Sequence, residues 1–180
     1  MNVSLSNTEF VDLVDANDRV IGAATVGRCL EEGLLHRAVA VLVERGGGRF
    51  LLQQRSRKDV WHPGLWTISC TGHVKQGETY DAAASRELLE ELSLGARLTK
   101  AKKYLLPPIT SGQQTEREWV ALFTCHTDSR YSIDPVELEA VREVSEAQLR
   151  YMVDKGPLTP DAKIILADFL ASGNKLRRRT

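Results

Sequence analysis

The sequence has few cysteines, few aromatic residues and no net charge. Its cysteines, Cys29, Cys70 and Cys125, are odd in number and widely spaced, which argues against a disulfide framework and leaves no CxxC pair for zinc. Lysine plus arginine and aspartate plus glutamate both number 24, so no overall field attracts nucleic acid or an anionic membrane. These features predict a cytoplasmic protein that binds neither nucleic acid nor membrane.

Long hydrophobic runs are also missing. The apolar run at 38–43 is far too short to span a bilayer, and residues 1–10 lack the basic and apolar regions of a secretory signal. The chain does have 42% hydrophobic residues over 180 positions, enough for the core of one ordinary domain. We expect a single domain over 1–180, with a core at about 35–170 and an N-terminal β-hairpin extension over 8–34.

Local patterns predict both strands and helices. Residues 9–26 predict a strand, a turn and a strand, and residues 36–56 predict a hairpin around RGGGR. Strands are expected at 96–109 and 117–127, with a loop at 110–116 between them. Helices are expected at 79–92, 145–156 and 159–173, with Ser145 and Thr159 as N-caps and Pro160 in the first helical position. The irregular alternation favours an α/β fold with a mixed sheet flanked by helices.

The predicted helix at 79–92 carries three carboxylates within five residues, on Glu87, Glu90 and Glu91. Like charges at this spacing repel by a few tenths of a kcal/mol per pair. On composition alone a solvated helix face is the commoner explanation. Anionic oxygen ligands are also what Mg²⁺ or Mn²⁺ prefers. The opposite, apolar side of the helix is expected to face the core and consists of Leu88, Leu89 and Leu92.

The spacing around these glutamates favours the cation. Residues 72–94 match the pattern G-x5-E-x7-R-E-U-x-E-E-x-G-U, in which U is aliphatic, with Ser93 in place of the last glycine. The matching residues are Gly72, Glu78, Arg86, Glu87, Leu88, Glu90, Glu91 and Leu94. Through this Nudix box the chain resembles the Nudix hydrolase family. The resemblance implies an α/β/α sandwich with a mixed sheet and a loop-helix-loop catalytic motif.

The resemblance also implies a metal site that hydrolyses a diphosphate linked to another moiety. Glu87 and Glu91 would be the leading ligands of Mg²⁺, or alternatively Mn²⁺, with Glu90 as a third ligand and the Gly72 carbonyl as a further one. Glu90 and Glu91 would also serve catalysis, and Arg86 would orient a carboxylate. The metal would neutralise phosphate charge and lower the pKa of a bound water that attacks phosphorus.

A second resemblance covers most of residues 9–125 and points to type I isopentenyl diphosphate isomerase. It rests on VDLVDANDRVIG, LLHRAVAVLV, RFLLQQRS, PGLWTISCTGH and EREW. That isomerase shares the Nudix fold but moves a double bond by protonation and deprotonation. It implies a metal held by three histidines and two glutamates. His36, His73, Glu116 and Glu118 stand at matching positions, and the third histidine would fall near Cys29.

Two features separate the chain from the isomerase. The isomerase acid/base cysteine should stand two residues before His73, where this chain has Thr71. Cys70 is one residue too early, and a one-residue shift in a strand turns a side chain to the opposite face. A threonine hydroxyl has no useful pKa near neutrality, and the box is nearly complete where the isomerase branch tends to an eroded one. The sequence favours a hydrolase of a small diphosphate compound, with the isomerase as the alternative.

Several polar residues have two interpretations. His36 and His73 are either packed structural histidines or contacts to a second metal or the substrate. Glu116 and Glu118 share one face of a predicted strand, as a solvated pair or as a further metal ligand and the general base. Arg55 is either surface charge or a phosphate contact. The identity of the diphosphate substrate and the oligomeric state, a homodimer included, are left open by the sequence.

Overall fold

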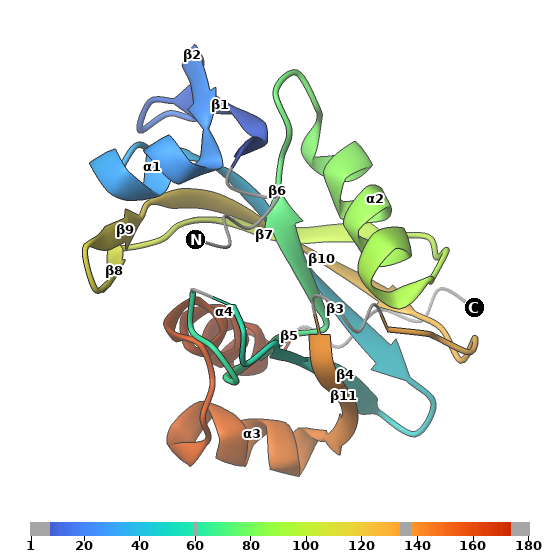
Figure 1. Ribbon diagram of the computed structural model, residues 1–180. Coiled ribbons are helices and arrows are strands. Elements are labelled where there is room, and N and C mark those ends of the chain that lie inside the picture. The colour runs from blue at the N-terminus through green and yellow to red at the C-terminus, as the bar shows by residue number, and fades with distance from the viewer. Residues whose placement is uncertain (1–7, 60, 134–137, 174–180) are drawn as a thin grey trace.

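The computed structural model describes residues 8–59, 61–133 and 138–173. Its strands form a sheet, and helices cover both faces of that sheet (Figure 1). In chain order the elements are β1 (Phe10–Val14), β2 (Val20–Thr25), α1 (Val26–Glu32), β3 (His36–Arg45), β4 (Arg49–Arg55), β5 (Trp66–Ile68), β6 (Cys70–His73), α2 (Tyr80–Leu92), β7 (Thr99–Leu105), β8 (Ile109–Ser111), β9 (Gln114–Glu116), β10 (Glu118–His126), β11 (Leu138–Ser145), α3 (Glu146–Lys155) and α4 (Pro160–Ala171).

Strand β3 is at the centre of the sheet. It pairs in parallel with β10 and antiparallel with β1, β4 and β6. β10 continues to β7, and β4 continues to β5 and β11. Within the described residues, nine strands form this sheet, and β8 and β9 form a separate two-stranded one. A parallel pair among antiparallel neighbours makes the sheet mixed, which confirms the predicted α/β fold.

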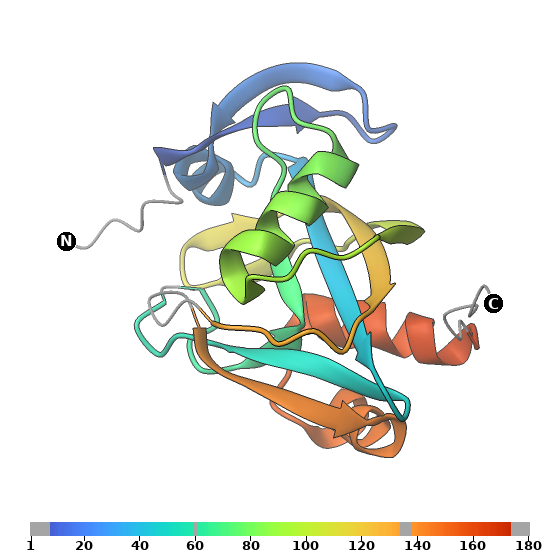
Figure 2. The ribbon, with the colours of Figure 1, turned by 90° about the vertical axis from the view of Figure 1, so that its right-hand side faces the viewer.

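Each face of the sheet buries its own apolar layer. Helix α2 covers one face, where Leu88 and Leu92 pack against Val39 and Val41 of β3. Helices α3 and α4 cover the other face (Figure 2). Their leucines, isoleucine and phenylalanine belong to one buried cluster with residues of β3, β4 and β10. Because both faces are covered, β3 is apolar at every position from 38 to 43 rather than at every second one. No helix among the described residues is both long and apolar enough to cross a bilayer.

Most local predictions are confirmed. The two hairpins form at β1–β2 and β3–β4, and α2 occupies the predicted glutamate helix. Helix α3 begins with a capping box, in which Ser145 and Gln148 satisfy each other's backbone N–H groups. Helix α4 begins with Pro160 after Thr159 as predicted, although the Thr159 side chain makes no capping hydrogen bond.

Three local predictions are wrong or incomplete. Residues 110–116 are not a simple loop, because most of them belong to the β8–β9 hairpin. Strand β11 has no counterpart among the predicted elements. Leu89 does not face the core, since 59% of its surface is exposed. The buried stripe of α2 runs through Ala84, Leu88 and Leu92 and includes two of the glutamates, which leaves Leu89 on the outer side.

Candidate metal and substrate site

Helix α2 presses two of its glutamates against β6. Glu87 and Glu91 are 9% and 6% exposed, so they do not belong to a solvated helix face. The backbone N–H of Thr71 donates to Glu91 Oε2 at 3.3 Å. Buried carboxylates are costly without such partners, and their convergence at one strand is the arrangement that a divalent cation site requires.

The strand provides the space for Glu87 by having glycine at position 72. A Cβ on Gly72 would lie 2.2 Å from Cδ of Glu87 and 2.3 Å from its Oε1, far inside van der Waals contact. The Glu87 carboxylate therefore occupies the volume that any other side chain would fill. The structure places Gly72 beside the box carboxylates, and the role of its carbonyl as a ligand stays a prediction.

Arg86 ties the box together. Its guanidinium donates to Glu78 at 2.9 and 3.0 Å, to Glu87 Oε1 at 2.6 Å and to Glu90 Oε2 at 3.0 Å. It also donates to the carbonyl of His73 at 3.0 Å. Burial lowers the pKa of Arg86, but these carboxylates outweigh burial and raise it well above its ordinary value. The positive charge of Arg86 thus offsets the repulsion among the glutamates and fixes the orientation of Glu87.

Glu90 differs from the other two glutamates. Its side chain is 54% exposed and contacts Arg86 four residues earlier. Arg86 links Glu90 to Glu87, while Glu87 and Glu91 are buried against the sheet. A metal patch formed by all three carboxylates stays a prediction.

A second group of potential ligands lies on the other face of β6. One ligand atom from each of His36, His73 and Glu118 fits within a spread of 4.8 Å. His36 Nε2 lies 3.4 Å and His73 Nε2 3.7 Å from Glu118 Oε1, and the two rings are 5.3 Å apart. The register explains this, because Glu118 pairs with His36 across β10–β3 and His73 pairs with Ala38 across β6–β3.

His36 directs its Nε2 at this cluster. His36 is fully buried, and its Nδ1 lies 2.9 Å from the carbonyl oxygen of Leu34, which makes Nδ1 the donor. Nε2 is buried and makes no hydrogen bond to the described part of the chain. A buried imidazole nitrogen beside a second imidazole and a carboxylate fits a transition-metal ion.

The protons of this cluster are unevenly distributed. Burial, with help from His36, lowers the pKa of His73 to about 4, so His73 is neutral near pH 7. Burial also lowers the pKa of His36, but the Cys29 thiol and Glu118 outweigh it and raise that pKa well above its ordinary value. Burial raises the pKa of Glu118, and His36 more than reverses this. A bound cation would replace the proton on His36.

Glu116 lies beside this cluster but does not join it. Its Oε2 accepts a hydrogen bond from Trp61 Nε1 at 3.1 Å. Burial, with Glu118 and Asp161 nearby, raises its pKa well above the ordinary value. Asp161, from the first turn of α4, was not singled out from the sequence, because an acidic residue at a helix start is common for helix-dipole reasons alone.

Arg55 is held by partners of its own. Its Nη2 donates to Asp59 Oδ2 at 2.5 Å and its Nε donates to the carbonyl of Trp61 at 2.8 Å. It lies near Glu116, whose pKa it lowers in opposition to burial. The structure thus places Arg55 at the rim of the histidine cluster, and a phosphate contact stays a prediction.

Cys70 and Cys29 are both buried, one in strand β6 and the other in helix α1. Cys70 is fully buried on the α2 face, where burial and the carboxylates of Glu91 and Glu87 raise its pKa well above the ordinary value. Thr71 therefore shares the other face with His73. Cys29 is buried and interacts with the ring of His36, near where the isomerase resemblance places its third histidine.

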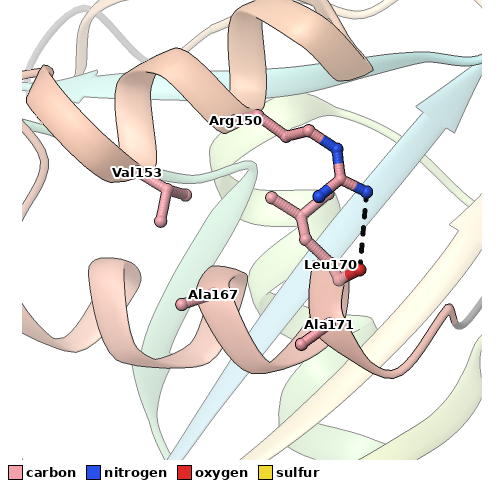
Figure 3. Close-up of a pocket in the computed structure, with 5 residues that line it drawn as sticks. All are labelled: Arg150, Val153, Ala167, Leu170 and Ala171. Atoms are coloured by element: carbon pink, nitrogen blue, oxygen red, sulfur yellow. Dashed lines mark hydrogen bonds between the residues drawn. The ribbon is translucent and has the colours of Figure 1, made fainter.

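A pocket of about 250 Å³ between α3 and α4 offers no comparable chemistry (Figure 3). Val153, Ala167, Leu170 and Ala171 line it together with Arg150. The guanidinium of Arg150 is already bonded to Glu146 at 2.7 Å and to the carbonyl of Leu170 at 3.5 Å. The candidate site is therefore the region around β6.

Residues 34–169 match the family model of the NUDIX domain. The sandwich, the ordered box helix and this match together show that the chain belongs to the Nudix family.

The relatives of the chain include proteins named as isomerases and proteins named as uncharacterized Nudix hydrolases. It is 36% identical to an isopentenyl-diphosphate Delta-isomerase of Serratia proteamaculans over 72% of each chain. It is 37% identical to the Nocardia farcinica isomerase, covering 78% of this chain and 81% of that one. It is 29% identical to a Yersinia pestis protein named an uncharacterized Nudix hydrolase, covering 93% and 88%.

The fold also matches solved structures. The crystal structure of DR0079 from Deinococcus radiodurans superimposes with a TM-score of 0.74 at 19% identity, covering 89% of this chain and 98% of that one. At this identity the likeness shows the fold alone.

Proposed function

We propose that the protein is a Mg²⁺-dependent hydrolase that cleaves the diphosphate linkage of a small diphosphate compound, with Mn²⁺ as an alternative metal. The observation that carries the proposal is the ordered and nearly complete box, which departs from the pattern only at Ser93. Glu87 and Glu91 are buried against β6, and Arg86 holds Glu87 in place. A chain that only binds nucleotides or diphosphates has no evident need for these buried carboxylates.

In this proposal Glu87 and Glu91 hold the metal, with Glu90 and the Gly72 carbonyl as further ligands. A bound divalent cation neutralises phosphate charge and lowers the pKa of a bound water. Arg86 orients Glu87 and prevents the carboxylates from repelling one another. Glu118, which lies with His36 and His73 on the other face of β6, stays the predicted general base. Burial raises its pKa, but His36 outweighs burial and lowers it, so Glu118 is ionised near neutrality and can accept a proton.

Isopentenyl diphosphate isomerase activity is the second candidate. It is favoured by the cluster of His36, His73 and Glu118 and by the relatives that carry the isomerase name. Against it, the face of β6 that carries His73 has Thr71 where the isomerase resemblance requires a thiol, and Cys70 lies on the other face. We therefore rank hydrolysis first.

The test is a panel of diphosphate compounds that includes isopentenyl diphosphate and nucleoside diphosphate-linked substrates, with Mg²⁺ or Mn²⁺. Phosphate release and isomer formation are both assayed. Glu91→Gln should lower phosphate release by at least about 10-fold. Asp81→Asn is the matched control, because Asp81 lies on the same helix and its carboxylate bonds to Lys100 on the surface. Wild-type turnover by Glu91→Gln on every substrate would refute the assignment.

A further inference from the structure

The N-terminal hairpin holds the loop that leads into the box helix. The family match begins at residue 34, yet β1, at residues 10–14, lies beside the loop before α2 (Figure 2). The backbone N–H of Gln76 donates to the carbonyl of Phe10 at 2.8 Å, and Val11 forms a β-bridge with Lys75. The Lys75 ammonium lies 2.7 Å from Glu9 Oε1.

Asp12 makes the side-chain contact to this loop. It is 8% exposed, and its Oδ2 accepts a hydrogen bond from the backbone N–H of Gly77 at 3.0 Å. Gly77 has a φ of 75°, a left-handed conformation that suits glycine. Burial lowers the pKa of Arg37, but Asp18 outweighs burial and raises it, and the nearby Asp12 adds a smaller attraction. Asp12 thus holds the turn at Gly77, its residue with a left-handed backbone conformation.

From that turn a continuous series of contacts reaches a proposed metal ligand. Glu78 follows Gly77 directly, and its Oε2 accepts from the backbone N–H of Lys75 at 3.1 Å. Both oxygens of Glu78 then hold Arg86, at 2.9 and 3.0 Å. Arg86 holds Glu87 Oε1 at 2.6 Å. A displaced Gly77 would therefore shift the carboxylate that orients Arg86.

The hairpin is itself firmly anchored. Asp18, at its turn, accepts hydrogen bonds from Arg37 at 2.6 Å, from Lys103 at 2.7 Å and from the Tyr80 hydroxyl at 3.1 Å. Tyr80 is the first residue of α2. The hairpin therefore contacts the box on both sides, at the loop through Asp12 and at the helix start through Asp18.

We propose that Asp12 is a positioning residue for the Nudix box: by holding Gly77 it sets the loop from which Glu78 and Arg86 orient Glu87. The metal affinity of the box then depends on a residue that precedes the matched family segment. This inference rests on the proposed metal site, and it is independent of which diphosphate the protein cleaves.

The test measures Mn²⁺ binding by the full chain, from the free Mn²⁺ signal in electron paramagnetic resonance. The part of the binding that Glu91→Gln removes is assigned to the box. Asp12→Ala should weaken this part by about 10-fold. Asp12→Asn keeps an acceptor oxygen facing Gly77 and should restore most of the affinity.

Asp15→Ala is the matched control. The Asp15 carboxylate accepts from the backbone N–H groups of Asn17 at 2.8 Å and Arg19 at 2.9 Å, within the hairpin's own turn. This variant loosens the hairpin without removing a bond to the box loop, so its Mn²⁺ affinity should match the wild type. Circular dichroism at the assay temperature verifies that each variant is folded.

Two results would overturn the inference. One is wild-type Mn²⁺ affinity in folded Asp12→Ala. The other is an equal loss of Mn²⁺ affinity in Asp12→Ala and Asp15→Ala, which would mean that Asp12 only stabilises the hairpin. The hydrolase proposal fails separately: if Glu91→Gln lost Mn²⁺ but kept full turnover, the box would not be catalytic, while the effect of Asp12 on its metal affinity would stand.

Discussion

Gly72→Ala is the most direct perturbation of the box geometry. The added Cβ would lie 2.2 Å from Glu87 Cδ and 2.6 Å from its Oε2. To restore an ordinary contact, the carboxylate or strand β6 must move by roughly 1 Å, and a misplacement of that size can cost about 100-fold in rate. We therefore expect kcat/KM for the best substrate of the panel to fall about 100-fold, with weaker Mn²⁺ binding. The overpacking itself should cost about 1–3 kcal/mol of stability.

The assay combines kcat/KM, Mn²⁺ binding and urea unfolding, so that loss of function is separated from loss of fold. Gly95→Ala is the control, because a Cβ on Gly95 meets no atom within 4 Å, and this variant should behave as the wild type. A folded Gly72→Ala protein with wild-type kcat/KM and Mn²⁺ affinity would refute the view that Glu87 acts from the space beside Gly72.

Three further predictions concern the charges. Arg86→Ala should lower kcat/KM by about 10- to 100-fold, with Arg86→Lys intermediate; equal rates in all three proteins would contradict the orienting role. Burial raises the pKa of Asp18, but Lys103 and Arg37 outweigh it and hold that pKa below its ordinary 3.8. The ion pairs of Asp18 therefore stabilise the fold above that pH and fade below it. Asp18→Asn should cost on the order of 2 kcal/mol near pH 6 and clearly less near pH 3 in urea unfolding; a cost independent of pH would contradict this. Removal of divalent cations by EDTA should abolish phosphate release, and added Mg²⁺ should restore it; turnover that survives EDTA would contradict a metal mechanism.

Features encoded by neighbouring residues could be predicted from the sequence. The spacing of Gly72, Arg86, Glu87 and Glu91 is local, and it predicts the helix and its match to the family. The Ser145 cap and Pro160 at the start of α4 depend only on the first turn of each helix. These predictions are confirmed because tertiary packing favours the same local structures as the sequence signals do.

Features set by distant partners could not be predicted. Strand β11 lies against β4, between 83 and 96 residues earlier in the chain, and its mixed burial shows no clear alternation. Leu89 belongs to a run of good helix formers, and only the packing of α2 on β6 decides that Glu87 and Glu91 are inside while Leu89 is outside. Helical periodicity alone assigned the stripe to the leucines.

The assembly of the candidate site was partly predictable. The histidines and Glu118 were selected from the isomerase resemblance, and the pairing of β3 with β6 and β10 then brings them together. The contact of Asp12 with Gly77 joins positions 65 residues apart. No local pattern marks it, because an aspartate in an edge hairpin has many ordinary uses.

Hydrolysis by the box can be distinguished from isomerisation in a single experiment. Isopentenyl diphosphate and the best substrate of the panel are each incubated with protein and Mg²⁺ in deuterated water and followed by phosphorus and proton magnetic resonance. We expect metal-dependent release of a phosphate product from the best substrate, with neither an allylic isomer nor deuterium incorporation from isopentenyl diphosphate. A deuterated allylic diphosphate, formed without phosphate release from any substrate, would contradict it.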